Sequence, residues 1–182
     1  MSEEILNTIK TRRVIREMSD QPVEKALLEK ILEAGRWAPA GGNMRACRFV
    51  AVQDPLTIRL VRTFSPGMFQ RPQVLIVICI DWNVIRTNQI PESDTTPYID
   101  VGAAMQTMML AAHALGLGSG PVTSFSEAAI RIVLNLPQYL SPEVIICIGY
   151  PAPPEKSQLP MLPKKRVTWQ SLTYWERIRK AK

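Results

Sequence analysis

Histidine and cysteine are scarce in this sequence. Its 182 residues include a single histidine, His113, and three cysteines, Cys47, Cys79 and Cys147. No two cysteines have the spacing of metal ligands, and each lies in an apolar stretch typical of a strand. His113 falls within an alanine-rich helical pattern. The sequence therefore argues against a metal site and against a Ser-His-Asp hydrolase, and we expect the cysteines to be reduced thiols packed in the core.

Long hydrophobic runs and a basic leader are also missing. The longest run without a polar residue, Val74 to Ile80, is far too short to span a bilayer. The first residues, Met-Ser-Glu-Glu-Ile-Leu, carry acidic side chains where a secretory signal carries basic ones. We therefore expect a cytoplasmic protein with no membrane contact, folded as a single domain over residues 1–182.

Acidic residues are fewer than basic ones, 16 against 22, which leaves a formal net charge of +6. Such an excess indicates an anionic partner, either nucleic acid or a phosphorylated cofactor. Two basic clusters lie near the ends of the chain: Arg12, Arg13 and Arg16, and then Lys164, Lys165 and Arg166. Neither belongs to a long basic face with interleaved aromatic residues, as a nucleic-acid surface would. The clusters fit a phosphate, which arginine can bind with two parallel hydrogen bonds, although a charge cluster alone is usually a solvated surface.

Hydrophobic periodicity and capping residues predict more helices than strands. The expected helices are a first one capped by Ser2, a second that ends near Trp37, and others over Leu56 to Phe64, Ile99 to Leu115 and Ser126 to Leu134. The expected strands are Cys47 to Gln53, Val74 to Ile80 and Val144 to Tyr150, with a last strand or helix through Trp169, Leu172 and Trp175. This mixture indicates an α+β sandwich with a small, mostly antiparallel sheet.

Four segments interrupt these patterns. Residues 38–43 form a glycine-rich loop without Walker or Rossmann spacing, in which Asn43 can bond to the edge of a heterocycle. Residues 116–121 form a second glycine-rich connection. Residues 81–97 are expected to be a substrate-side loop or to contain a short helix. Residues 151–182, which open on a proline-rich stretch, are expected to be an extended C-terminal arm.

The order of several short motifs resembles that of nitroreductase-family flavoproteins. The N-terminal half carries Thr11-Arg12-Arg13-Val14-Ile15-Arg16, then Trp37-Ala38-Pro39-Ala40-Gly41-Gly42-Asn43, then Arg48-Phe49-Val50-Ala51-Val52. The central helix of the family is matched by Asp100 to Gln106 and Ala111 to Gly118. The C-terminal end is matched by Gly149-Tyr150-Pro151, Lys164-Lys165-Arg166 and Tyr174-Trp175-Glu176. Each motif is modest, but together they cover nearly the whole chain in the right order.

The resemblance implies a three-layer sandwich that forms an interlocked homodimer, with one FMN at each of two sites lined by both subunits. It makes Arg12, Arg13 and Arg16 binders of the FMN phosphate, ribityl chain and pyrimidine edge, with Lys164 and Arg166 completing the phosphate site. It also implies that Pro39, Ala40, Gly41 and Asn43 reach the flavin of the partner, and that Thr123 and Ser124 pass the reactive N5 edge. FMN would carry the redox step between NADH or NADPH and a small acceptor, a nitroaromatic, a quinone or a similar molecule, by a ping-pong mechanism, so no catalytic side chain is expected.

Three departures from the family pattern bear on the substrate, and one of them is Thr123-Ser124, which replaces the more acidic or glycine-rich versions of some relatives. Val14 stands in the phosphate-binding segment where the family commonly has serine. Arg45-Ala46-Cys47 replaces the usual Gln-Pro-Trp, and Arg45 would favour an anionic acceptor if it pointed into the pocket. Two alternatives remain open: a same-fold enzyme that acts on a dedicated metabolite or on the flavin itself, and a basic nucleic-acid-binding module without enzymatic activity.

Overall fold

Four antiparallel strands form the centre of the molecule. The computed structural model describes residues 2–153 and 167–177. The strands are β1 (Cys47–Val52), β2 (Val74–Asp81), β3 (Gly118–Val122) and β4 (Leu140–Gly149), and their order in the sheet is β1-β2-β4-β3. In register, Val50 of β1 lies opposite Val77 of β2, and Val77 lies opposite Ile145 of β4. Strands β2 and β4 are therefore central, and β1 and β3 are the edges.

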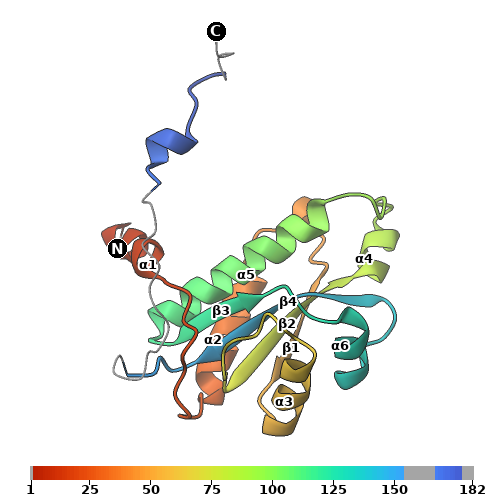
Figure 1. Ribbon diagram of the computed structural model, residues 1–182. Helices are drawn as coiled ribbons and strands as arrows, with labels where there is room; N and C mark the ends of the chain where they lie inside the picture. The colour runs from red at the N-terminus through yellow and green to blue at the C-terminus, as the bar shows by residue number, and fades with distance from the viewer. Residues whose placement is uncertain (1, 154–166, 178–182) are drawn as a thin grey trace.

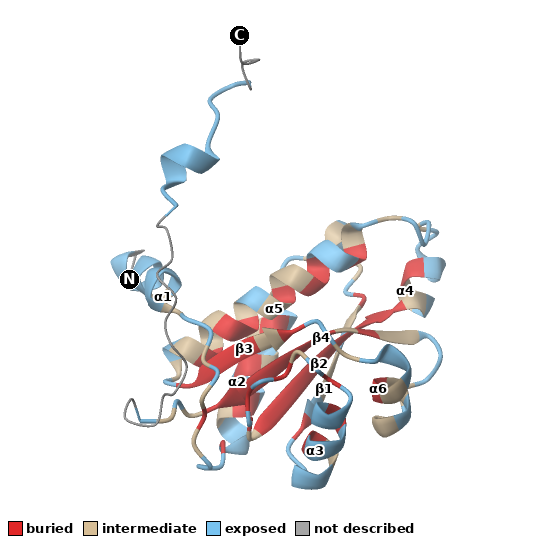
Figure 2. Cartoon of the chain, in the orientation of Figure 1, coloured by how far each residue is buried: buried red, intermediate tan, exposed pale blue. Residues whose placement is uncertain are grey.

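Both faces of the sheet are covered by helices, because β2 is apolar on both sides. Val74, Ile76 and Ile78 point to one side and meet α2 (Lys25–Arg36) and α5 (Thr96–Ala114). The alternate residues of β2 meet α3 (Pro55–Thr63) and α6 (Glu127–Val133) on the other side. Figures 1 and 2 show the sheet between these helix pairs, with its buried centre in red. The expected three-layer α+β sandwich is confirmed.

Capping side chains fix where α3 and α6, the two helices on the second face of the sheet, begin. The side chain of Asp54 accepts a hydrogen bond from the Thr57 amide and begins α3, with Pro55 at the first helical position. The side chain of Ser126 accepts from the Ala129 amide and begins α6. Both starts follow the sequence prediction.

The segments predicted as irregular contain a short helix, as one of the two expectations for residues 81–97 had it, and also a strand that was not expected. Residues 81–97 contain the short helix α4 (Trp82–Thr87), which Asp81 caps through the amides of Asn83 and Val84. Helix α5 begins at Thr96 rather than Ile99, because Pro97 fits the first turn of a helix. The glycine-rich segment after α5 is the edge strand β3, paired with β4, rather than a loop.

The first helix and the C-terminal segment extend from the sandwich. Helix α1 (Ser2–Thr11) contacts α5, and its apolar residues Ile5, Leu6 and Ile9 are exposed. Residues 167–177 carry the short 3-10 helix η3 (Trp169–Leu172) and lie away from the sheet in Figure 1. In the described residues, no helix is long and apolar enough to cross a membrane, and no group of three or more His, Cys, Asp or Glu side chains could hold a metal ion.

Candidate functional site

Residues 12–16, which follow α1, lie along the edge strand β3. We call these residues, together with Ser119 and Gln70 beside them, the strip. Val14 pairs with Ser119 as an isolated parallel bridge, and the Ile15 amide donates to the Ser119 carbonyl at 3.0 Å. These contacts leave no room for a side chain at two positions of β3: a Cβ on Gly118 would lie 2.8 Å from Ile15, and one on Gly120 would lie 2.5 Å from Gln70 Nε2. The glycines of β3 therefore allow the basic segment and Gln70 to approach the sheet closely.

Several buried polar atoms of this strip have no partner among the described residues. They are Arg12 Nε and Nη1, Gln70 Oε1 and Ser119 Oγ. Buried polar groups are nearly always hydrogen-bonded, because an unmade bond costs the full desolvation of the group. Guanidinium nitrogens without partners indicate a missing anion, and the amide oxygen indicates a missing N–H donor. The strip is therefore built to receive a polar, anionic ligand.

The other residues that the resemblance assigns to the same flavin are exposed or lie outside the described residues. Arg13 and Arg16 are exposed, and Arg13 Nη1 donates to the Lys10 carbonyl at 2.6 Å. Thr123 and Ser124 follow β3 and are exposed, and the Gly67 amide donates to the Ser124 carbonyl at 3.2 Å. That bond ties the loop before Gln70 to the predicted N5 segment. Lys164 and Arg166 lie outside the described residues.

The glycine-rich loop is held by the N-terminal half of α5. Both carboxylate oxygens of Asp100 accept from the Gly41 amide, at 2.9 and 3.1 Å, and Asp100 is buried. A Cβ on Gly41 would lie 2.1 Å from the Thr96 methyl, so the close contact requires glycine. Residues 41–43 form the 3-10 turn η1, in which Asn43 has a φ of 56°. Pro39 and Asn43 are exposed, and Ala40 is half-buried.

The strip and the loop are attached to opposite ends of α5. Thr11, the last residue of α1, bonds to His113 Nε2 at 2.9 Å, whereas the loop is bonded to Asp100. The 13 intervening helical steps span about 20 Å at 1.5 Å per residue. The start of the strip and the loop are therefore held at different ends of this helix. Val14 lies against β3, and the chain continues from the end of β3 into Thr123 and Ser124.

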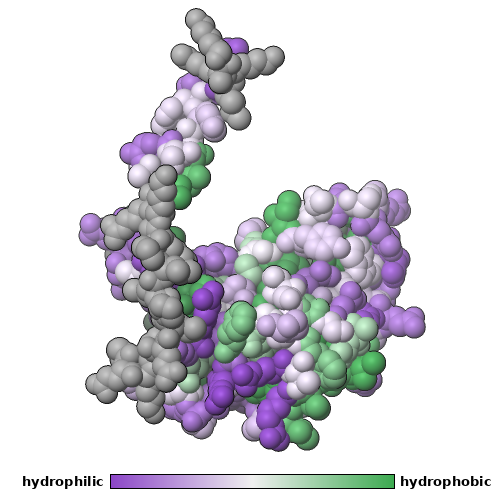
Figure 3. Space-filling view, in the orientation of Figure 1, coloured by the Kyte–Doolittle hydropathy of each residue, from purple (hydrophilic) through white to green (hydrophobic). Residues whose placement is uncertain are grey.

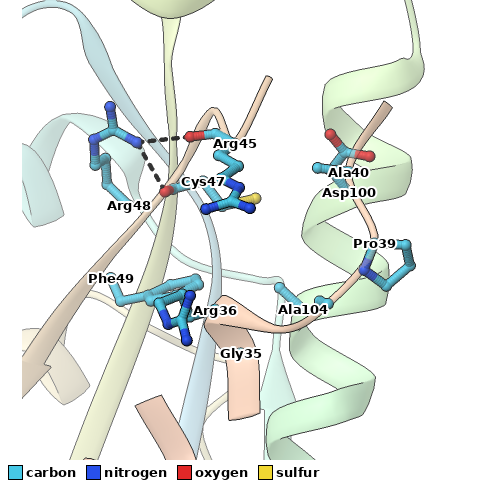
Figure 4. A pocket seen from close by; sticks show the side chains of 11 residues that line it. Gly35, Arg36, Pro39, Ala40, Arg45, Cys47, Arg48, Phe49, Asp100 and Ala104 are labelled. Carbon is cyan, nitrogen blue, oxygen red and sulfur yellow. Dashed lines mark hydrogen bonds between the residues drawn. The ribbon is translucent and has the colours of Figure 1, made fainter. Parts of the chain in front are cut away.

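A pocket of about 280 Å³ lies between the loop, β1 and α5. Figure 4 shows Arg45 and Cys47 on its β1 side and Ala40 and Asp100 on its α5 side. Burial, and secondarily the negative charge of Asp100, raise the pKa of the Cys47 thiol to about 11, against the opposing effect of Arg48. Cys47 is therefore a protonated, unreactive wall residue at neutral pH. Cys79 and Cys147 are free and buried, as predicted.

Three residues of the candidate site were not singled out from the sequence. Gln70 and Ser119 are polar residues next to apolar strand patterns, and their importance follows from burial, which a single sequence does not show. Asp100 stands within the helical motif of the resemblance, but its bond to Gly41 crosses 59 positions of the chain. A buried acid at the start of an otherwise apolar helix is the signal that could have identified it.

Comparison with known proteins places this architecture in a family. The Nitroreductase family profile matches residues 9–74 and 62–150. The chain is 28% identical over 184 residues to an FMN reductase [NAD(P)H] of Bacillus subtilis, covering 92% of this chain and 73% of that protein. It is 28% identical over 171 residues to an NADH dehydrogenase of Thermus thermophilus, covering 78% and 83%. A crystal structure of a nitroreductase family protein from Clostridium difficile superposes with a TM-score of 0.80 and 30% identity, over 95% of this chain and 98% of that one.

The α+β sandwich with its four-stranded antiparallel sheet is thus shared with a nitroreductase family protein. The chain belongs to the nitroreductase family. The resemblance found in the sequence is confirmed.

Proposed function

We propose that this protein is an FMN-dependent NAD(P)H oxidoreductase that works as a homodimer and passes electrons to a small acceptor. The observation that carries the proposal is the set of unpartnered buried polar atoms at Arg12, Gln70 and Ser119 in a chain of this family. The cofactor is FMN, and the electron donor is NADH or NADPH. The FMN reductase of Bacillus subtilis, whose name gives both molecules, supports this assignment.

The strip fits the cofactor chemically. Arg12 offers two buried N–H groups to a phosphate or ribityl oxygen, and Arg13 and Arg16 add positive charge at the surface. Gln70 has a buried oxygen that can accept an N–H from the pyrimidine edge of the ring. Val14 contributes no side-chain hydrogen bond, so its role is the backbone pairing with Ser119. Lys164 and Arg166 complete the phosphate site in this proposal.

The loop serves the partner's flavin. Pro39, Ala40, Gly41 and Asn43 are held about 20 Å along α5 from the strip of their own chain. A second copy must therefore bring its loop to the strip, with two equivalent sites in a twofold dimer.

The exposed apolar surface supports this dimer. Ile5 and Ile9 of α1 are 64% and 48% exposed, and Trp169 and Trp175 of the C-terminal segment are 61% and 71% exposed. In Figure 3 this segment stands apart from the body of the molecule and includes a small hydrophobic area in green. On α5, no atom lies within 4 Å of the Cβ position of Gly102, so a second helix can approach closely there. Single chains rarely leave such surfaces uncovered.

The side chains bind and orient, and the cofactor supplies the redox chemistry by taking a hydride from the nicotinamide and giving electrons to the acceptor. We assign Thr123 and Ser124, which are exposed, to the N5 edge of the ring, beside the space that donor and acceptor would occupy in turn. Use of the same space by both substrates gives ping-pong kinetics. No described side chain is assigned a proton-transfer role.

Absorbance of the purified protein tests the proposal. We expect the spectrum of bound FMN, bleaching by NADH or NADPH without oxygen, and recovery of the oxidised spectrum with an added quinone or nitroaromatic. Light scattering should give the mass of two chains. A protein that stays colourless after incubation with FMN would contradict the cofactor, and consumption of one flavin per turnover would contradict its role as a recycled cofactor.

A further inference from the structure

Arg45 carries the one guanidinium in the pocket whose charge no described carboxylate offsets. Three arginines line that pocket, but two are paired: Arg36 with Glu33 at 2.5 Å, and Arg48 with Asp81 at 2.9 Å. Arg45 has only the bond from its Nε to Asn43 Oδ1, at 3.1 Å, and no salt bridge among the described residues. Both of its terminal amino groups remain available for two parallel bonds to one anion.

The backbone holds Arg45 in an uncommon conformation at this place. Its φ is 54°, in the left-handed region that side chains with a Cβ rarely adopt. The carbonyl of Arg45 accepts from Arg48 Nη1 at 2.8 Å, which fixes the turn at the start of β1. Figure 4 shows the side chain beside Cys47, at the pocket. Unfavourable backbone conformations that the surroundings enforce are common at ligand-binding sites.

The rest of the pocket sets the shape and polarity of what can bind. Its volume, about 280 Å³, is at the lower end of small-molecule sites, so it suits a single ring and not a dinucleotide. Phe49, Pro39 and alanine side chains give apolar walls. Asp100 carries a negative charge on the α5 side, opposite Arg45, but both of its oxygens accept from the Gly41 amide. The Arg45 side chain is therefore the part of the pocket suited to an anionic group, and the apolar walls are suited to a ring.

We propose that Arg45 forms a carboxylate subsite that selects small aromatic acceptors bearing an anionic group. This inference rests on the proposed function, because Pro39 and Ala40 line this pocket and also belong to the loop assigned to the partner's flavin. A ring in the pocket then borders that flavin. The subsite gives the enzyme a preference for anionic over neutral acceptors of the same shape.

The test compares 4-nitrobenzoate with 4-nitrobenzamide as acceptors for the FMN-loaded dimer. Arg45→Met should raise the KM for the nitrobenzoate at least about tenfold, the loss of one charged hydrogen-bonding group, and change that for the amide less than about twofold. Arg45→Lys should retain part of the preference. Arg36→Met is the matched control, because it removes a guanidinium from the same pocket that is already paired with Glu33. The ratio of the KM for the nitrobenzoate to the KM for the amide should therefore stay as in the wild type.

Benzoate, which cannot be reduced, separates this subsite from the proposed function. Titration calorimetry on the oxidised protein should show binding that Arg45→Met abolishes and Arg36→Met retains, whether or not the protein turns over. Equal KM ratios in wild type and Arg45→Met, or an equal loss in Arg36→Met, would overturn the subsite. A loss confined to flavin reduction by NADH or NADPH would also overturn it, because the anion would then be the phosphate of the donor.

Discussion

The strip after α1 and the glycine-rich loop differ in how their polar groups are satisfied. On the strip, nitrogens of Arg12 and oxygens of Gln70 and Ser119 are buried without partners in the described residues. On the loop, the Gly41 amide has two acceptor atoms in Asp100, and Asn43 accepts from Arg45. The buried polar groups of the strip need a ligand as hydrogen-bond partner, whereas those of the loop are already bonded within the chain.

This contrast explains why neither segment is a site alone. The loop supplies a surface of fixed shape and little charge-assisted binding. The strip supplies groups that bind the ligand but leaves one face of the ligand uncovered. Because α5 keeps the two about 20 Å apart in one chain, the dimer is what joins them in our proposal. Substitutions on the strip should act mainly on flavin affinity, and those on the loop mainly on the geometry of the assembled site.

The largest effect is expected from Arg12→Ala. Loss of the buried guanidinium removes charged hydrogen bonds, worth about 1.5–3 kcal/mol, so the FMN dissociation constant should rise about 10- to 150-fold. Riboflavin, which has no phosphate, should lose less affinity. Flavin fluorescence on titration measures both. Arg59→Ala, an exposed arginine on α3, is the control and should leave FMN affinity unchanged. Equal FMN affinity in wild type and Arg12→Ala would mean that the strip is not the phosphate side.

The loop should respond to Gly41→Ala through shape alone. The added methyl would lie 2.1 Å from the Thr96 methyl, and overpacking of this kind costs about 1–3 kcal/mol. We expect a displaced loop, slower turnover and weaker dimerisation, measured by steady-state kinetics and light scattering. Thr96→Ser removes the opposing methyl, so the double variant should recover much of the loss. Failure of this rescue would show that the contact with Thr96 is not the constraint.

Much of the fold was predictable because local signals agree with the global structure. The fully apolar run at Val74 matches a central strand, and Asp54 and Ser126 cap helices that begin within one residue of their expected starts. Strand β3 was missed because its glycines fit a turn as well as a strand. They are required by the approach of Ile15 and Gln70, a contact between distant parts of the chain.

The site was predictable only in part for the same reason. Arg12 and Gly41 stand in motifs, so the resemblance identified them, while Gln70 and Asp100 act through burial and through partners far away in sequence. For Arg45, sequence left open a pocket or a surface position. The structure combines the two, because Arg45 lines the pocket and its side chain is exposed.

Gln70→Leu distinguishes the ring end of the strip from its phosphate end. If Gln70 accepts from the pyrimidine edge, its loss should weaken the binding of FMN and riboflavin alike, by about fivefold for a bond of about 1 kcal/mol. The unliganded protein should be no less stable, because an apolar side chain replaces a buried oxygen that has no partner. Thermal unfolding without flavin checks this second outcome. A destabilised unliganded protein with unchanged flavin affinity would make Gln70 purely structural.

The smallest effect is expected at Cys47, which lines the pocket beside the hydrogen-bonded loop. Its pKa, raised to about 11 by burial and by Asp100, keeps the thiol protonated, so iodoacetamide should label it slowly at pH 8 and much faster near pH 11. Because an unfolded thiol ionises near pH 9, this side chain favours the folded state below pH 9, and that contribution is lost as pH rises from 9 through 11. Cys47→Ala should therefore show a smaller fall in the free energy of unfolding between pH 8 and 10 than the wild type. Rapid labelling at pH 8 would mean that the pocket around Cys47 opens to solvent. The loop side would then not be the rigid, hydrogen-bonded counterpart of the strip.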